Sequence, residues 1–161
     1  MITFDRRAAR GAMCDATLTL DCEARRKSRV KVTLDSGEQA GIMLQWGELL
    51  CHGDVLATAE GRLVRIVAAP EPVMLVRCSH PRELARVAYH LGNRHVAVEV
   101  GEGVLKLAPD HVLRAMVQGL GAEVELATLP FEPEPGAYGA HAHDPSGATV
   151  ATKITGSKQA S

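Results

Sequence analysis

The fold of this chain is decided by residues 73–100, which read VMLVRCSHPRELARVAYHLGNRHVAVEV. Four consecutive apolar residues at the start predict a buried strand. Pro81 is typical of a first helical position, and apolar residues then recur at helical spacing until Gly92, where we expect the helix to stop. An alternating run from His95 to Val100 predicts a second strand with its valines in the core. The stretch therefore predicts a β-α-β unit.

A second unit with the same pattern follows. A glycine-rich turn at residues 101–103 leads into a predicted strand at residues 104–107. Asp110 is suited to cap a second helix, and a short strand at residues 123–127 ends the run. The order β-α-β-β-α-β is the ferredoxin-like arrangement, so we assign residues 73–138 to a ferredoxin-like βαββαβ domain.

Residues 1–70 predict a small N-terminal antiparallel β-domain. Alternating apolar and polar residues at 16–20 and 30–34 are typical of half-buried strands, and a turn at residues 35–38 predicts a hairpin. Residues 69–72 contain two prolines and are predicted to form a short, stiff linker. The fold class predicted for the whole chain is α+β.

The ends and the charged clusters carry less structure. The composition changes to proline and glycine after Pro130, and residues 139–161 have little to bury, so they predict a flexible C-terminal tail. Two arginine-rich clusters, at residues 6–10 and 25–29, are interpreted as solvated loops near strand ends.

Composition excludes several classes of function. The 161 residues carry a net charge of -1, which argues against nucleic acid as a partner. No apolar run is long enough for a membrane helix, and the first residues do not resemble a signal peptide. The four cysteines are scattered without a Cys-x-x-Cys pair, so we expect reduced thiols and a cytoplasmic protein.

Histidines carry most of the functional signal. His95 follows a probable helix end, but one imidazole does not hold a metal tightly, whereas a two-fold dimer would present it twice. His141 and His143 form a possible mobile pair in the tail, and His111 is a possible auxiliary ligand at a helix start. Imidazole with oxygen donors suits Ni²⁺, Zn²⁺ or Cu²⁺.

Two other hypotheses remain open from the residues. The chain could be a metal-dependent hydrolase in which His95 and His141 bind Zn²⁺ and Glu99 acts as the base. It could also be an interaction module whose β-domain binds a protein partner, with metal binding incidental.

Three segments together are diagnostic, namely residues 89–95 (YHLGNRH), 110–113 (DHVL) and 129–139 (LPFEPEPGAYG). In this order they closely resemble the urease accessory nickel metallochaperone family, usually called UreE. Residues 49–56 resemble the family's Leu-x-x-x-Gly-Asp-x-Leu pattern.

This resemblance implies a fold and a role. It implies a peptide-binding-like β-domain at residues 1–70, followed by a metal-binding and dimerisation domain at residues 73–138. His95 from each protomer of a homodimer would bind nickel at the interface, and His141 and His143 would extend the site. The protein would have no catalytic activity of its own. It would deliver Ni²⁺ to the urease apoprotein through an accessory complex that includes a GTPase.

Overall fold

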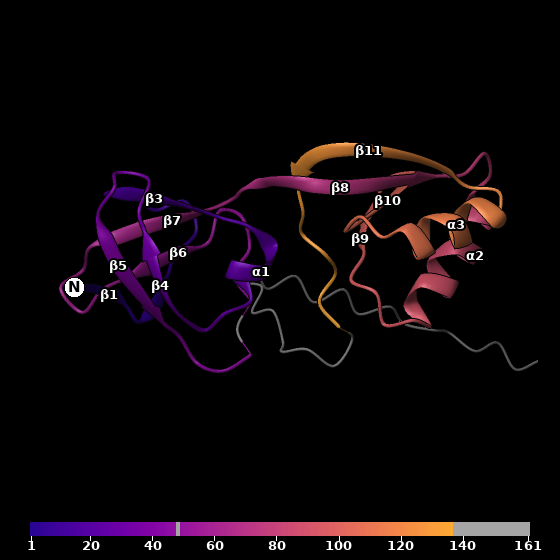
Figure 1. The fold of residues 1–161 in the computed structure, drawn as a ribbon. Coiled ribbons are helices and arrows are strands. Elements are labelled where there is room, and N and C mark those ends of the chain that lie inside the picture. The colour runs from indigo at the N-terminus through magenta and orange to yellow at the C-terminus, as the bar shows by residue number, and fades with distance from the viewer. Residues whose placement is uncertain (48, 137–161) are drawn as a thin grey trace, which may run out of the picture.

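The computed structural model describes residues 1–47 and 49–136. Two lobes, one from each half of the chain, are joined by the long strands β8 (Pro70–Arg77) and β11 (Glu123–Pro130), which run side by side (Figure 1). The predicted tail, residues 139–161, lies outside the described residues. Among the helices of the described part, none combines the length and the apolar composition needed to cross a membrane.

Two small sheets and a short helix form the N-terminal lobe. The strand orders are β1-β5-β4 and β2-β6-β7-β3. Inward-facing side chains of both sheets, among them Phe4, Leu18, Ile42 and Ile66, share one core. The elements are β1 (Ile2–Phe4), β2 (Arg6–Ala8), β3 (Ala16–Leu20), α1 (Cys22–Arg25), β4 (Arg29–Thr33), β5 (Gln39–Met43), β6 (Val55–Ala57) and β7 (Leu63–Ala68).

The prediction of a purely antiparallel β-domain is only partly correct. Strands β4 and β5 form the predicted antiparallel hairpin, with Gly37 at a φ of 90° in its turn. However, β1 runs parallel to β5, and β3 runs parallel to β7. Alternation of apolar and polar residues identifies a strand but not its direction. Both parallel pairs join strands that are far apart in the chain, as parallel pairing requires.

The C-terminal lobe contains a four-stranded sheet covered by two helices. Its strand order is β11-β8-β10-β9, and all neighbours are antiparallel. The elements follow the predicted order β-α-β-β-α-β, and the α+β class is confirmed. Both helices lie on one face of the sheet (Figure 1), where Val87, Leu91 and Val117 pack against Met74 and Val76 of β8. The other elements are α2 (Pro81–Gly92), β9 (Glu99–Gly101), β10 (Val104–Leu107) and α3 (His111–Gly119).

Both helices begin where the sequence predicts. Pro81 is the first residue of α2. The carboxylate of Asp110 caps α3, because it accepts a hydrogen bond from the Leu113 N–H at 2.8 Å. These local signals therefore fix the helix starts without help from the rest of the fold.

Most of the predicted linker, residues 69–72, belongs to a strand. Pro70 is the first residue of β8 and pairs with Pro130 of β11. Strand β10 pairs with β8 only from Met74 onward, so Pro70 and Pro72 lie where one edge of β8 has no described neighbour. The boundary between the two predicted domains stays a prediction.

A small third core lies where the two lobes meet. Cys22 of α1 packs there against Val73 and Leu75 of β8 and against Phe131, which follows β11. The Cys22 N–H also donates to Glu71 Oε2 at 2.8 Å. The short helix α1 is therefore attached to the strand that leads into the C-terminal lobe.

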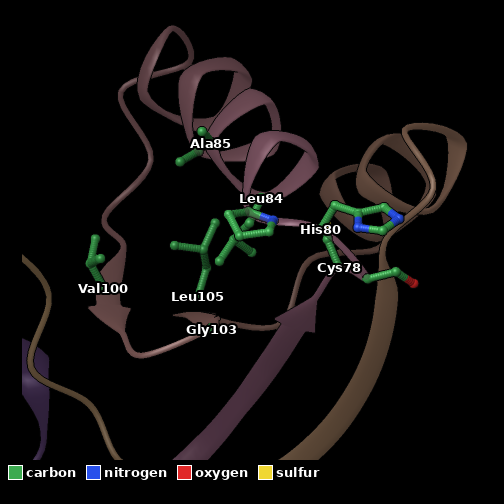
Figure 2. Close-up of a pocket in the computed structure, with 10 residues that line it drawn as sticks. Cys78, His80, Leu84, Ala85, Val100, Gly103 and Leu105 are labelled. Carbon is green, nitrogen blue, oxygen red and sulfur yellow. The ribbon is translucent and has the colours of Figure 1, made fainter.

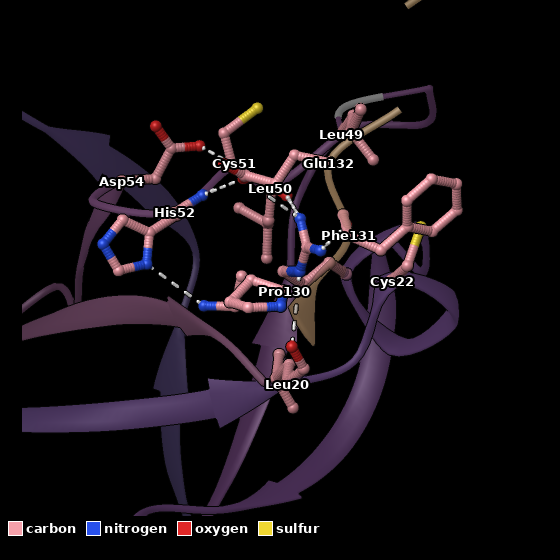
Figure 3. Close-up of polar contacts among 12 residues, drawn as sticks. Leu20, Cys22, Leu49, Leu50, Cys51, His52, Asp54, Pro130, Phe131 and Glu132 are labelled. Atoms are coloured by element: carbon pink, nitrogen blue, oxygen red, sulfur yellow. Dashed lines mark hydrogen bonds and ion pairs between the residues drawn. The ribbon is translucent and has the colours of Figure 1, made fainter. Parts of the chain in front are cut away.

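The side chain of Arg25 spans this junction and is 1% exposed. Its guanidinium donates to the carbonyl oxygens of Leu20 and Leu50 in the N-terminal lobe, and to that of Phe131 beyond β11 (Figure 3). It also forms an ion pair with Glu132 at 3.3 Å. One cation thus satisfies acceptors from both halves of the chain.

The interpretation of the arginine clusters as solvated loops is wrong for Arg25, which is buried at the junction. Arg7 and Arg10 are exposed, but both form ion pairs with the buried carboxylate of Asp54. The acceptors lie far along the chain, so a run of basic residues gives no sign of them.

Replacing Arg25 by Met should lower the free energy of unfolding by about 3–5 kcal/mol, because buried acceptors lose a charged donor. Urea unfolding measures this change. Arg26→Met is the matched control. The Arg26 side chain is exposed, so its loss should change the free energy of unfolding by less than about 0.5 kcal/mol. Equal losses in the two variants would contradict the role of Arg25.

Candidate metal centre

His95 lies in the turn after helix α2 and has a left-handed backbone conformation. Its φ is 55°, and it is the one non-glycine residue with positive φ in the described part of the chain. The His95 N–H donates to the Gly92 oxygen at 3.0 Å, and the Val96 N–H donates to the Leu91 oxygen at 3.3 Å. These two bonds form a Schellman motif, in which the left-handed position usually belongs to glycine.

Helix α3 ends with the same motif and a glycine. Gly121 has a φ of 92°, its N–H donates to the Gln118 oxygen at 3.0 Å, and the Ala122 N–H donates to the Val117 oxygen at 3.0 Å. His95 and Gly121 therefore occupy equivalent positions. A side chain there costs on the order of 1 kcal/mol relative to glycine, and such strain clusters at functional sites.

The prediction that His95 opens a strand is wrong. Gly92 is the last residue of α2, and it is not the left-handed residue that ends the helix. The Schellman turn takes up residues 93–96, and strand β9 begins only at Glu99. Val100, a predicted core residue, is 57% exposed. The alternating valines imitate a strand pattern, whereas most of this stretch is a loop.

The predicted ligands are not gathered into one site by the described residues. His95 is exposed, and so is His111 at the first position of α3. Among the residues that the structure describes, no three His, Cys, Asp or Glu side chains could hold a metal ion together. His141 and His143 lie outside the described residues. A metal site at His95 would need ligands from the tail or from a second copy.

The cysteines do not extend this set. All four are free thiols. Burial raises the pKa of the Cys22, Cys51 and Cys78 thiols, which favours the protonated form over the thiolate that binds metal. His52 beside Cys51 has a structural contact, because its Nδ1 accepts the Ala68 N–H at 3.3 Å.

Asp54, in the Gly-Asp turn of the N-terminal lobe, is the centre of a cluster of ion pairs. Asp54 accepts from Arg10 at 2.6 Å, from Arg7 at 2.7 Å and from the Cys51 N–H at 2.8 Å. Burial opposes the charge of Asp54, but these donors outweigh it and hold the pKa of the carboxyl below its usual value. The carboxylate therefore stabilises the turn.

Glu99 is not placed to act as a catalytic base. Its Oε1 accepts from Lys106 Nζ at 2.8 Å, and its Oε2 accepts from the Glu132 N–H at 2.7 Å. Lys106 Nζ also donates to the Pro130 oxygen at 2.9 Å. Both carboxylate oxygens are therefore engaged, one with Lys106 and one with the segment after β11, which argues against the hydrolase hypothesis.

The segment after β11 passes beside the chain that follows His95. The Glu134 N–H donates to the Val98 oxygen at 2.8 Å, and the two segments run close together below the sheet (Figure 1). Val98 is three residues after His95, and Glu134 is seven residues before His141. The root of the tail is thus attached close to the histidine turn.

An apolar pocket of about 470 Å³ lies along α2 (Figure 2). Leu84 and Ala85 of the helix face Val100 and Leu105 of the sheet across it. Tyr89, on the same helix, is 66% exposed. Apolar side chains of α2 are thus accessible both at the pocket and at Tyr89.

Sequence reasoning missed or misread four residues that organise this region, namely Arg25, Glu99, Lys106 and Glu132. Their contacts join positions between 5 and 107 residues apart, so no spacing rule reveals them. The available signal is that Glu132 belongs to the diagnostic stretch at residues 129–139.

Comparison with known proteins covers nearly the whole chain. The family model of the UreE urease accessory protein N-terminal domain matches residues 6–69, and that of its C-terminal domain matches residues 71–153. The urease accessory protein UreE of Pseudomonas putida strain W619 is 51% identical over 144 residues, covering 89% of each chain.

Two further relatives of the same name show a similar level of identity. The urease accessory protein UreE of Burkholderia vietnamiensis strain G4 is 51% identical over 154 residues, covering 89% of this chain and 77% of the relative. The urease accessory protein UreE of Alkalilimnicola ehrlichii strain MLHE-1 is 50% identical over 139 residues, covering 86% of this chain and 85% of the relative.

The backbone of His95 predicts an unusual order of stability. His95→Gly should be more stable than His95→Ala by about 1 kcal/mol, because glycine alone accepts positive φ without strain. Urea unfolding of the metal-free protein measures the difference. Gly121→Ala is the matched control. No atom lies within 4 Å of an added Cβ there, so only backbone strain acts, and the free energy of unfolding should fall by about the same amount. If His95→Ala were as stable as His95→Gly, the backbone at position 95 would not be strained.

Proposed function

Because this chain belongs to the UreE family of urease accessory proteins, we propose that it binds Ni²⁺ and delivers it to the urease apoprotein. The metal is held between two protomers by His95 from each. His141 and His143 add donors from the tail, and His111 is an auxiliary ligand. Imidazole also accepts Zn²⁺ and Cu²⁺, which compete for such a site.

The observation that carries this proposal is the position of His95. An exposed imidazole stands on a strained turn where the equivalent turn of α3 has glycine. No complete ligand set surrounds it within the described part of the chain. A residue near a two-fold axis meets its own copy, so a dimer supplies a second imidazole at once.

The apolar surface of α2 supports a homodimer on this side of the molecule. The pocket beside Leu84, together with exposed Tyr89 and Val100, would be covered by a second copy. Exposed apolar patches of this kind commonly mark interfaces. Covering them would also remove water from around the metal and strengthen its binding.

The chain is long enough for the tail histidines to reach His95. Seven residues from Glu134 to His141 span at most roughly 25 Å, and the three residues from His95 to Val98 span roughly 10 Å. A donor from another part of the chain adds affinity while it is bound and opens an exit path when it dissociates. A carrier needs both properties, because it must give up the ion.

The remaining parts of the proposal concern the partners. The protein acts in the cytoplasm without catalytic turnover, and it passes Ni²⁺ to the urease apoprotein through an accessory complex that includes a GTPase. Family membership supports these steps.

Calorimetric titration with Ni²⁺ tests the interfacial site. Wild type should bind about one tight ion per two chains, and His95→Ala should lose this tight binding because both imidazoles disappear. His90→Ala is the matched control, since His90 lies in the last turn of the same helix. Tight binding retained in His95→Ala would show that His95 is not a ligand. One tight ion per chain would show that the two protomers do not share a single ion.

Ending the chain after Tyr138 tests the tail separately. Removal of His141 and His143 should weaken Ni²⁺ binding and speed its release, while His95 keeps the stoichiometry. Competition titration with a chelator measures the affinity, and stopped-flow chelation measures the release. Unchanged values would mean that the tail histidines are not ligands.

A further inference from the structure

Strand β4 lies at the edge of its sheet. Among the described residues it pairs only with β5. The Leu44 N–H donates to the Ser28 oxygen at 2.8 Å, so Ser28 and every second residue after it form the hydrogen-bonded pairs of this ladder. Arg29 and Lys31 alternate with these residues. Their backbone N–H and C=O groups therefore point away from β5, and no described group bonds to them there.

The side chains along this edge are basic. Arg29 and Lys31 are exposed on the outer face of the sheet, and Arg26 is exposed in the turn before β4. None of these three forms an ion pair with another described residue, whereas Lys27 pairs with Glu23 at 3.0 Å. The edge therefore carries positive charge that the described part of the chain does not neutralise.

An exposed aromatic side chain lies in the loop that follows β5 (Figure 1). Trp46 is 92% exposed and is the only tryptophan of the chain. The loop leaves β5 at Met43, which is 52% exposed and lies directly opposite Arg29. The other end of the loop is attached by the Leu50 N–H, which donates to the Arg25 oxygen at 3.1 Å. Both ends thus lie beside the residues that lead into β4, so Trp46 and the basic edge belong to one surface.

We propose that this surface docks an extended acidic segment of a partner protein, which adds to β4 as a further strand. The backbone groups of Arg29 and Lys31 bond to the segment, and their side chains face its alternate carboxylates. Trp46 covers an apolar side chain at one end, because tryptophan and arginine commonly dominate the binding energy of protein interfaces. The surface lies in the N-terminal lobe and uses none of the proposed metal ligands, so the inference goes beyond the proposed function.

The charge of the edge selects its occupant. Open strand edges commonly carry lysine, which prevents copies of the same strand from pairing. Two β4 edges brought together would place Arg29 and Lys31 near like charges, which disfavours a second copy of this chain. Carboxylates at alternate positions of the added strand reverse the sign of that interaction. An anionic membrane would also attract the cations, but it offers no strand to bond to the backbone of β4.

Fluorescence of Trp46 tests the docking directly, because no other tryptophan contributes to the emission. The probe is a capped peptide in which glutamate alternates with valine, and the control probe carries glutamine at every glutamate position. With the metal-free protein, the glutamate peptide should shift the emission to shorter wavelength as the indole is covered. The glutamine peptide should bind about tenfold more weakly, because it lacks the carboxylates that face Arg29 and Lys31.

Substitutions test which residues carry the binding. Arg29→Gln combined with Lys31→Gln should weaken binding of the glutamate peptide about tenfold, because two charge pairs across the strands disappear. Arg82→Gln combined with Arg86→Gln is the matched control, since it removes the same charge from exposed positions on α2 and should leave binding unchanged. Trp46→Ala, followed by calorimetry because the fluorescence is lost, should weaken binding by at least about tenfold.

Amide hydrogen exchange distinguishes strand addition from a contact between side chains alone. When the glutamate peptide is bound at saturation, the Arg29 and Lys31 amides should exchange about tenfold more slowly, because each gains a hydrogen bond. The Val30 and Val32 amides already face β5 in the hydrogen-bonded pairs, so their exchange should not change.

Several results would overturn this docking surface. They are an unshifted emission with the glutamate peptide, equal affinity for the glutamine peptide, equal losses in the two double variants, and unchanged exchange at Arg29 and Lys31. A response to vesicles of phosphatidylserine and phosphatidylcholine, without a response to the peptide, would assign the surface to a membrane instead. His95→Ala should bind the peptide as wild type does, so failure of the proposed nickel site leaves this test intact.

Discussion

Burial of the Arg25 guanidinium constrains how the two halves of this molecule are arranged. A guanidinium stays charged in a protein and offers five donors in a plane, so a buried one must be surrounded by acceptors. Here the acceptors are Leu20 and Leu50 from one lobe, and Phe131 and Glu132 from the segment after β11. Displacing either group would leave the buried charge with only part of its acceptors. The lobes are therefore held in register by electrostatics as well as by the small core around Cys22.

The parts of the fold that could be predicted depend on neighbours in sequence. Pro81 and Asp110 start their helices for reasons contained in the next few residues, and the order of elements followed from local patterns. Strand direction in the N-terminal lobe and the burial of Arg25 depend on residues far away in the chain, so local patterns could not reveal them. His95 is a different case. Gly92 is the last residue of α2, as predicted, but the left-handed position that follows the helix is filled by the functional candidate.

The candidate site combines two features that would be unfavourable in a purely structural turn. The backbone at His95 carries strain that the equivalent Gly121 avoids, and the imidazole faces solvent without a complete set of ligands. Both features suit a site that is completed only on assembly. In the proposed function, the missing donors come from a second copy of the chain and from the tail histidines.

The prolines at the start of β8 have a consequence for solubility. Within the described residues, Pro70 and Pro72 lie where β8 pairs with β11 alone, so an open strand edge would otherwise be available to other chains. Proline has no N–H to donate, so this edge is a poor template for a further strand. The bridge between the lobes is thereby protected against edge-to-edge aggregation. Copies of the protein are left to meet through side chains, which can be specific, instead of through the backbone, which is not.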